Sequence, residues 1–105
     1  MSGDGECPKL DRIHHVAVVV GDVDKSARWY AERFCCEVVY RDETWALLQF
    51  GNLQVALVSP GEHAAHLAIL RKNASRFGKV RTHRDGVRYV YIMDPSGNTV
   101  EVVEG

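Results

Sequence analysis

The chain has 105 residues, of which 46% are hydrophobic and 26% charged, a composition typical of one globular domain rather than a disordered segment. Its formal net charge of −1 gives no electrostatic reason to bind nucleic acid or an anionic membrane, so we expect neither as a partner. The longest apolar run, Val16–Val20, is too short to span a bilayer, and the first residues lack the features of a signal peptide, which predicts a cytoplasmic protein.

Residues 1–11 (MSGDGECPKLD) are interpreted as a flexible lead-in, and residues 12–105 as a single domain. The chain contains three cysteines, Cys7, Cys35 and Cys36, which cannot form a closed set of disulfides and are therefore expected as reduced thiols. The adjacent Cys35 and Cys36 suit a metal or redox pair, but we favour small buried hydrophobic side chains at a helix end.

The first half of the chain predicts a strand, a helix and three further strands. The valine-rich segment Arg12–Val20 is the first strand, and Asp22 or Asp24 can cap the helix that follows. The apolar face of this helix is expected to carry Ala27, Tyr30, Ala31 and Phe34. Sequences typical of hairpin turns, RDET and GN, then separate three strands: Glu37–Arg41, Trp45–Phe50 and Leu53–Val58.

The second half repeats this order with a shorter crossover. A turn-rich linker, SPGEHA, leads into the strand His66–Leu70, and Asn73–Phe77 forms at most a short helix. A tight turn, Asp-Pro-Ser-Gly-Asn at 94–98, precedes the final strand. The last three strands are expected over Lys79–Arg84, Val87–Met93 and Thr99–Val103.

Comparison of the two halves indicates an internal duplication. Three short matches occur in the same order: HVAV (15–18) with HLAI (66–69), YRDETWALLQF (40–50) with HRDGVRYVYIM (83–93), and VALV (55–58) with VEVV (100–103). The fold class is therefore predicted as α+β, with two βαβββ modules over residues 12–58 and 64–105, the second with a shortened helix.

The duplication relates polar residues of the two halves that have no evident partner when each half is considered alone. His15 and His66 occupy equivalent positions in the two modules, and Glu101 is equivalent to Ala56. A single histidine in an apolar strand is usually a core or edge residue, and a single glutamate usually faces solvent. Two imidazoles and one carboxylate, however, can hold a divalent metal and leave other positions open. His14 should point away from this site because neighbouring strand residues alternate between faces.

Two long segments, IHHVAVVVGDVDKSARWYAERFCCEVV and HRDGVRYVYIMDPSGNTVEVVE, resemble the vicinal oxygen chelate superfamily. This superfamily includes glyoxalase I, extradiol dioxygenases, methylmalonyl-CoA epimerase and the fosfomycin- and bleomycin-resistance proteins. The resemblance implies a cup-shaped mixed sheet around a divalent metal ion (Fe, Mn, Ni or Zn) with His15, His66 and Glu101 as its ligands. Ala56 falls where glyoxalase I places a carboxylate ligand, which counts against that activity.

The second half also nearly matches the C-terminal signature of the extradiol dioxygenases. The matching residues are His83, Tyr91, the turn Asp94–Gly97 and Glu101, whereas Arg81 departs from the pattern. In that family, His83 would transfer protons and Tyr91 would form a hydrogen bond near the substrate. The alternatives are that His83 is a surface residue beside a hairpin turn and that Tyr91 is a core aromatic with its hydroxyl at the rim.

Together these patterns predict a metal-dependent enzyme that binds vicinal oxygens of a small-molecule substrate, with dioxygenase-like or lyase/isomerase-like chemistry. The first alternative is a non-catalytic drug-binding protein of the bleomycin-resistance type, and the second is a metal-binding fold kept for assembly or regulation. Because an open cup leaves strand edges exposed, we also expect a homodimer.

Overall fold

The computed structural model describes residues 9–105, so most of the lead-in expected over residues 1–11, including Cys7, lies outside the described residues. The first half of the chain forms β1 (Arg12–Val19), α1 (Val23–Arg33), β2 (Glu37–Arg41), β3 (Trp45–Gln49) and β4 (Gln54–Val58). The second half forms β5 (His66–Arg71), the 3₁₀ helix η1 (Ala74–Phe77), β6 (Arg81–Thr82), β7 (Arg88–Met93) and β8 (Thr99–Glu104). Neither helix of the described residues is long and apolar enough to cross a membrane.

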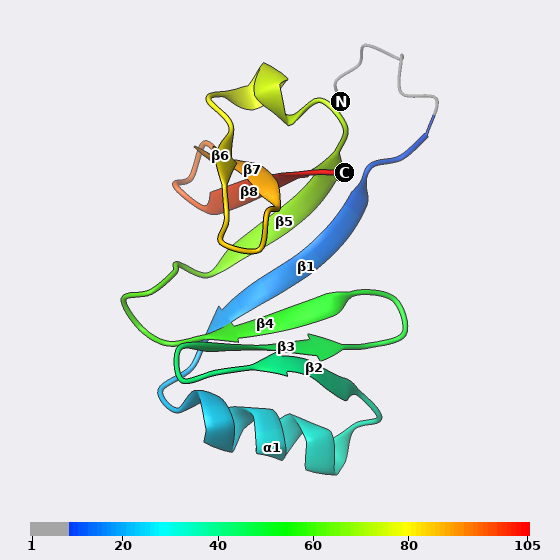
Figure 1. The fold of residues 1–105 in the computed structure, drawn as a ribbon, viewed down its shortest axis with the longest axis vertical. Helices are drawn as coiled ribbons and strands as arrows, with labels where there is room; N and C mark the ends of the chain where they lie inside the picture. Colours follow the sequence, from blue (N-terminus) through cyan, green and yellow to red (C-terminus); the bar gives the residue numbers. More distant parts are fainter. Residues whose placement is uncertain (1–8) are drawn as a thin grey trace.

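All eight strands of the described residues belong to one mixed sheet with the order β2-β3-β4-β1-β5-β8-β7-β6 (Figure 1). The two halves of the sheet are arranged alike. From one edge to the centre the strands are β2, β3, β4 and β1, and from the other edge they are the corresponding strands β6, β7, β8 and β5. The two halves meet at the centre, where β1 and β5 pair antiparallel within the same chain. This arrangement confirms the predicted α+β fold, with an open, cup-like sheet and a reduced second helix.

The strand registers are also equivalent in the two halves. Across the central pair, His15 lies opposite Ala68 and Ala17 lies opposite His66. In the parallel pairs, Ala17 lies opposite Ala56 and Ala68 lies opposite Glu101. The strand pairing therefore gives His15 and His66 equivalent positions in the two halves, and likewise Ala56 and Glu101, as predicted.

One irregularity interrupts β1. Ile13 pairs with Ile69, but His15 already pairs with Ala68, so His14 is an extra residue that forms a β-bulge. A bulge breaks the strict alternation of side chains between the two faces of a sheet. The face occupied by His14 therefore does not follow from its place in the sequence.

The helix α1 packs against β2, β3 and β4 on the outer face of the sheet. Of the two candidate caps, Asp22 is used: its carboxylate accepts a hydrogen bond from the Lys25 backbone N–H at 2.9 Å. The buried face consists of Val23 and Ala27, with Tyr30 packed beside them, which follows the helical period. Under this helix the sheet contributes Ala46, Leu48 and Leu57 to the core.

Two parts of the predicted helical face were wrong. Ala31 is exposed, and Phe34 is 51% exposed because it is the C-terminal cap and its extended backbone turns the side chain off the buried face. Cys35 is also exposed rather than buried, since it lies in the bend after the helix.

In the second half, η1 packs against β7 and β8 through a small core of Ala74, Val90 and Val102. The strand predicted over Lys79–Arg84 is reduced to the two residues of β6. It ends early because the chain turns back at His83, whose N–H donates to the carbonyl of Val87 at 2.8 Å. This turn places His83 at the end of the edge strand, next to β7.

Leu48 gives a direct test of the core beneath α1. Leu48 is completely buried, so Leu48→Ala should lower the free energy of unfolding by about 2 to 5 kcal/mol through lost apolar contacts and a cavity. Chemical denaturation followed by circular dichroism measures this change. Leu10→Ala is the control, because Leu10 is 90% exposed and its truncation should have little effect. Equal stabilities of the two variants would contradict the packing described here.

Candidate metal centre

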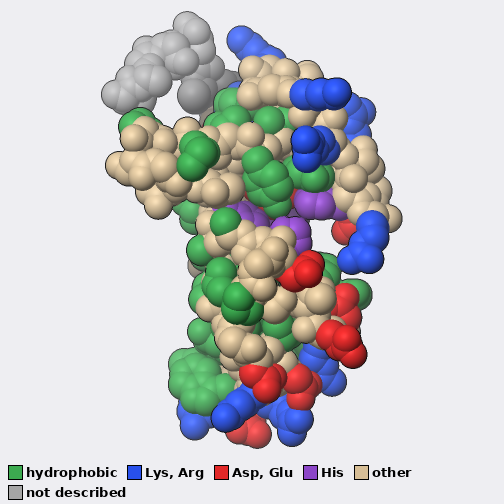
Figure 2. Space-filling model, turned by 90° about the vertical axis from the view of Figure 1, so that its left-hand side faces the viewer, with side chains coloured by type: hydrophobic (Ala, Val, Ile, Leu, Met, Phe, Trp, Pro, Cys, Tyr) green, Lys and Arg blue, Asp and Glu red, His purple; other side chains and the backbone are tan. Residues whose placement is uncertain are grey.

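A cleft of about 740 Å³ opens on the inner face of the sheet and receives side chains from both halves of the chain. Its lining includes histidines from β1 and β5, apolar side chains from β3 and β4, and Tyr91 and Glu101 from β7 and β8. Figure 2 shows histidine side chains in the hollow between the two parts of the molecule. The cleft is therefore the place where the residues singled out in the sequence meet.

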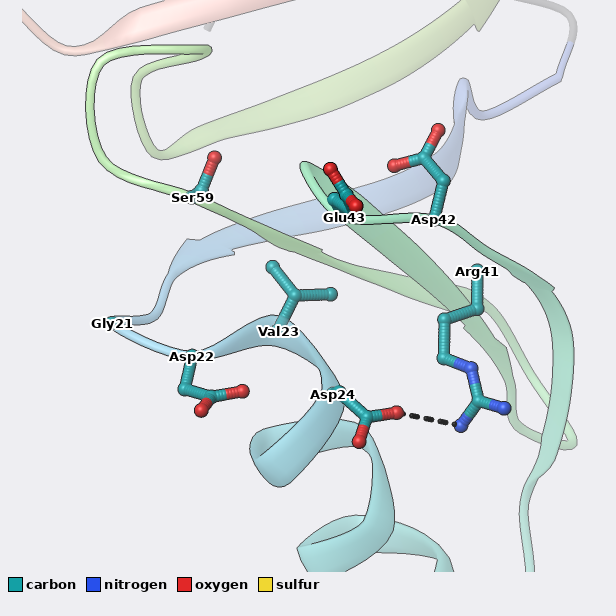
Figure 3. A pocket seen from close by; sticks show the side chains of 8 residues that line it. All are labelled: Gly21, Asp22, Val23, Asp24, Arg41, Asp42, Glu43 and Ser59. Atoms are coloured by element: carbon teal, nitrogen blue, oxygen red, sulfur yellow. Dashed lines mark ion pairs between the residues drawn. The ribbon is translucent and has the colours of Figure 1, made fainter.

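A smaller cleft of about 520 Å³ lies at the start of α1, between the helix and the β2–β3 turn (Figure 3). Three of its four acidic groups, Asp22, Asp24 and Asp42, already have partners. Asp24 forms ion pairs with Arg41, at 3.1 Å, and with Arg28, while Asp22 caps the helix. These contacts support the local fold and make this cleft the weaker candidate for a site.

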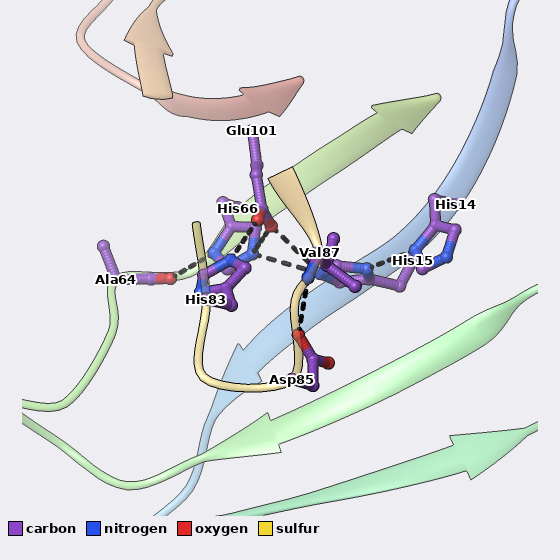
Figure 4. A network of polar contacts seen from close by, with 8 residues as sticks. All are labelled: His14, His15, Ala64, His66, His83, Asp85, Val87 and Glu101. Carbon is purple, nitrogen blue, oxygen red and sulfur yellow. Dashed lines mark hydrogen bonds and ion pairs between the residues drawn. The ribbon is translucent and has the colours of Figure 1, made fainter. Parts of the chain in front are cut away.

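Three of the predicted residues converge at the bottom of the larger cleft (Figure 4). The Nε2 atoms of His15 and His66 lie 3.2 Å apart. Oε1 of Glu101 lies 3.4 Å from the Nε2 atom of His15 and 3.1 Å from that of His66. The side chains of Glu101, His66 and His15 are only 4%, 5% and 14% exposed, so the three atoms form a compact, sheltered triangle.

The size of this triangle fits a divalent metal ion. Nitrogen and oxygen ligands bind such ions at about 2.1 Å, which separates two ligand atoms by about 3.0 Å at a right angle and about 3.4 Å at the tetrahedral angle. All three edges of the triangle lie within this range. The chemistry of the donors also fits, since two imidazoles and a carboxylate occupy one side of an ion and leave its other positions accessible.

Each of the three residues also has a hydrogen bond at the atom that faces away from the triangle. The Nδ1 atom of His66 lies 2.7 Å from the carbonyl oxygen of Ala64. Oε2 of Glu101 lies 2.8 Å from Nε2 of His83, and Nδ1 of His15 lies 2.8 Å from Nδ1 of His14. Such outer partners fix the orientation of metal ligands in proteins.

The histidines also determine the charge of Glu101. Burial opposes the charged form and would raise the pKa of this carboxyl group, but hydrogen bonds with His15, His66 and His83 outweigh burial. The pKa of Glu101 is therefore held well below its usual range, and the group is a carboxylate at neutral pH. The centre thus offers a negative charge to a cation.

The turn Asp94–Asn98 sets the position of Glu101 on β8. The Asp94 carboxylate accepts hydrogen bonds from the backbone N–H groups of Ser96 and Asn98, which closes the β7–β8 hairpin. In the resulting register Tyr91 lies opposite Glu101. Glu104 lies near the end of the strand and pairs with Arg88 at 2.9 Å instead of facing the cleft.

His83 and Tyr91, the two candidate catalytic residues, both lie beside the triangle. The ring of His83 stacks on Tyr89 at a centroid distance of 3.7 Å, which holds the imidazole next to Glu101. The ring of Tyr91 meets that of His66 edge-on at 5.8 Å. Burial, together with the charge of Glu101, raises the pKa of Tyr91 to about 12, so its hydroxyl group keeps its proton at neutral pH.

The expectation that His14 points away from the site was wrong. The bulge in β1 turns His14 toward the cleft, where it contacts His15. Burial, and then the neighbouring His15, lower the pKa of His14 despite the opposing effect of Glu101. Tyr89, which supports His83, was also missed, because its alternating position in an apolar strand resembles that of an ordinary core residue.

Known proteins place this architecture in a family. The family model of the glyoxalase/bleomycin resistance protein/dioxygenase superfamily matches residues 12–69. Methylmalonyl-CoA epimerase from Mycobacterium tuberculosis superposes with a TM-score of 0.73 and 19% identity, over 89% of this chain and 87% of that chain. No curated protein matches the sequence.

Two other solved structures have the same fold. A superfamily member from Vibrio splendidus 12B01 has a TM-score of 0.68 and 12% identity, over 91% of this chain and all (100%) of that chain. A single-substitution variant of Streptomyces coelicolor methylmalonyl-CoA epimerase in complex with 2-nitronate-propionyl-CoA has a TM-score of 0.69 and 17% identity, over 92% of this chain and 99% of that chain. Since the family model covers more than half of the sequence, the chain belongs to the glyoxalase/bleomycin resistance protein/dioxygenase superfamily.

Proposed function

We propose that the protein is a metal-dependent enzyme that binds two adjacent oxygens of a small substrate at a divalent ion held by His15, His66 and Glu101. The observation that supports this proposal is the triangle of ligand atoms, whose edges of 3.1 to 3.4 Å fit one ion. A bound Fe, Mn, Ni or Zn ion would act as a Lewis acid toward the substrate oxygens. The cytoplasmic location inferred from the sequence stays a prediction.

In this proposal, one residue beside the triangle transfers protons and another donates a hydrogen bond to the substrate. His83 lies next to Glu101, and an imidazole can take up and release a proton near neutral pH, so we assign proton transfer to His83. Tyr91 keeps its hydroxyl proton and can donate it in a hydrogen bond to a substrate oxygen. Both roles match a dioxygenase-like reaction on a catechol or related substrate.

A second candidate is a lyase- or isomerase-like reaction, favoured by the similarity in fold to methylmalonyl-CoA epimerase. Two assays on metal-loaded protein separate the candidates. Oxygen uptake with a catechol supports the dioxygenase-like reaction, whereas deuterium incorporation from heavy water into methylmalonyl-CoA supports the isomerase-like one. The non-catalytic alternative, a drug-binding protein, uses the same cleft without chemistry and predicts that purified protein contains no stoichiometric metal.

We also propose that the protein is a homodimer. The outer face of the two central strands keeps exposed apolar side chains, since Ile13, Val18 and Leu67 are 40%, 36% and 43% exposed. Val18 pairs with Leu57, which lies beneath α1, so Val18 belongs to the outer face just beyond the helix. Burial of these side chains against a second copy would remove apolar surface from water.

The metal ligands can be tested one at a time. Glu101→Ala should weaken binding of a divalent ion by more than the roughly 10- to 100-fold effect of losing an outer partner, because it removes both a ligand and its charge. His15→Ala and His66→Ala should behave in the same way. Elemental analysis and metal titration measure the effect, with circular dichroism as a check on folding.

Glu104→Ala is the matched control for the glutamate, because Glu104 is on the same strand but pairs with Arg88. It should retain wild-type metal content. Full metal retention in Glu101→Ala, or metal loss in Glu104→Ala alone, would refute the proposed ligand set.

His83→Gln separates proton transfer from metal binding. The glutamine amide can still donate a hydrogen bond to Glu101, but it cannot exchange protons, so metal content should stay while turnover falls by about 10²- to 10⁴-fold. Turnover is measured with the substrate identified by the two assays above, at saturating metal. Wild-type turnover in His83→Gln would exclude proton transfer by His83.

The dimer is tested by light scattering coupled to gel filtration. The wild-type protein should have the mass of two chains, and Leu67→Glu should shift it toward one chain because a charge would then lie in the apolar face. Leu10→Glu, outside the sheet, should leave the dimer intact. A monomeric wild-type protein at micromolar concentration would contradict the proposal.

A further inference from the structure

We propose that His14 is a positioning residue for the metal centre: its Nδ1 atom accepts the hydrogen bond that holds His15 in the orientation and tautomer needed to bind an ion. This inference rests on the proposed metal site. It starts from the contact of 2.8 Å between Nδ1 of His14 and Nδ1 of His15, on the side of the His15 ring opposite the triangle (Figure 4).

The requirement for an acceptor follows from the chemistry of imidazole. A neutral histidine carries one ring proton, and only the nitrogen without it can bind a metal. If Nε2 of His15 binds the ion, it can no longer donate a hydrogen bond to Glu101, so Nδ1 must carry the proton and needs a partner. Nδ1 of His14 is within hydrogen-bond distance of Nδ1 of His15. It can accept a hydrogen bond from the N–H group of His15 when Nδ1 of His14 carries no proton.

The equivalent histidine in the other half shows why β1 needs a side chain for this role. Nδ1 of His66 contacts the carbonyl oxygen of Ala64, which lies in the linker before β5 begins. By the duplication, the residue equivalent to Ala64 is Ile13. Ile13, however, lies within β1 and pairs with Ile69 in the sheet, so its position differs from that of the linker residue.

The β-bulge lets the side chain of His14 take the place that the Ala64 carbonyl has in the other half. Because His14 is the extra residue between two ladder positions, its side chain is released from strict alternation and turns toward His15 on the cleft side. The two rings meet edge-on with a centroid distance of 5.1 Å, which directs the nitrogen of one ring at the other. Each of the two ligand histidines thus has one outer partner, a backbone carbonyl for His66 and an imidazole for His15.

The test compares binding of Co²⁺, whose visible absorption reports the ligand geometry, to the wild-type protein, to Glu101→Ala and to three further variants. His14→Ala removes the acceptor and should weaken binding by about 10- to 100-fold. His14→Asn should restore most of the lost affinity and the wild-type spectrum, because its side-chain oxygen can accept a hydrogen bond from nearly the place of Nδ1. His63→Ala removes another histidine that lines the cleft but does not belong to the triangle, and it should bind as the wild type does.

A second measurement reads the tautomer directly. In Zn²⁺-loaded protein labelled with ¹⁵N, the ring of His15 should carry its proton on Nδ1, and in His14→Ala this signal should broaden or move as the ring loses its partner. Wild-type affinity and an unchanged His15 signal in His14→Ala would overturn the role of His14. So would a loss in His14→Asn as large as that in His14→Ala.

The design separates this inference from the proposed function. If the wild-type protein and Glu101→Ala bind Co²⁺ equally, the ligand set itself is wrong. If the wild-type protein binds and Glu101→Ala does not, the ligand set stands, and the His14 variants alone decide whether this residue positions His15.

Discussion

The antiparallel pairing of β1 with β5 is the interaction on which the candidate site depends. It joins the two halves of the chain and sets His15 opposite Ala68 and Ala17 opposite His66, so both histidines face the cleft. The parallel pairing of β5 with β8 then brings Glu101 beside Ala68. A shift of one residue in either ladder would turn one of the three side chains to the outer face, so the geometry of the candidate centre depends on the register of the sheet.

The candidate centre contributes little to the stability of the fold, which other parts of the structure have to provide. Glu101 is only 3% exposed, and a buried carboxylate is costly unless other groups compensate its charge. Three histidines provide hydrogen bonds to it, but such polar clusters contribute little net stability. The apolar layers beneath α1 and η1 therefore have to stabilise the sheet that holds these groups together. The apolar core thus holds the strands that carry the three polar side chains of the candidate centre.

The amino-acid sequence was sufficient to predict the succession of strands and helices along the chain and the three residues that converge, because both depend on periodicity and on internal duplication. His15, His66 and Glu101 became a set only when the two halves were compared. The direction of the His14 side chain was predicted wrongly, since alternation assumes a regular strand and the bulge is visible only in the pairing with β5. The contact of His83 with Glu101 was also beyond the sequence, because it depends on the turn that ends β6 early.

The two halves carry different residues at one pair of equivalent positions in the candidate site. Ala56 occupies the place in the first half that Glu101 occupies in the second, and it packs with Ala17 and Val58 beside Trp45. The cleft consequently has two unlike sides: β7 and β8 contribute the Tyr91 hydroxyl and the Glu101 carboxylate, whereas β3 and β4 contribute mainly apolar surface. A carboxylate at position 56 would place a second buried negative charge in the same cleft as Glu101. The alanine keeps that side of the triangle open, and in the proposed function it leaves apolar surface beside the ion for the carbon part of a substrate.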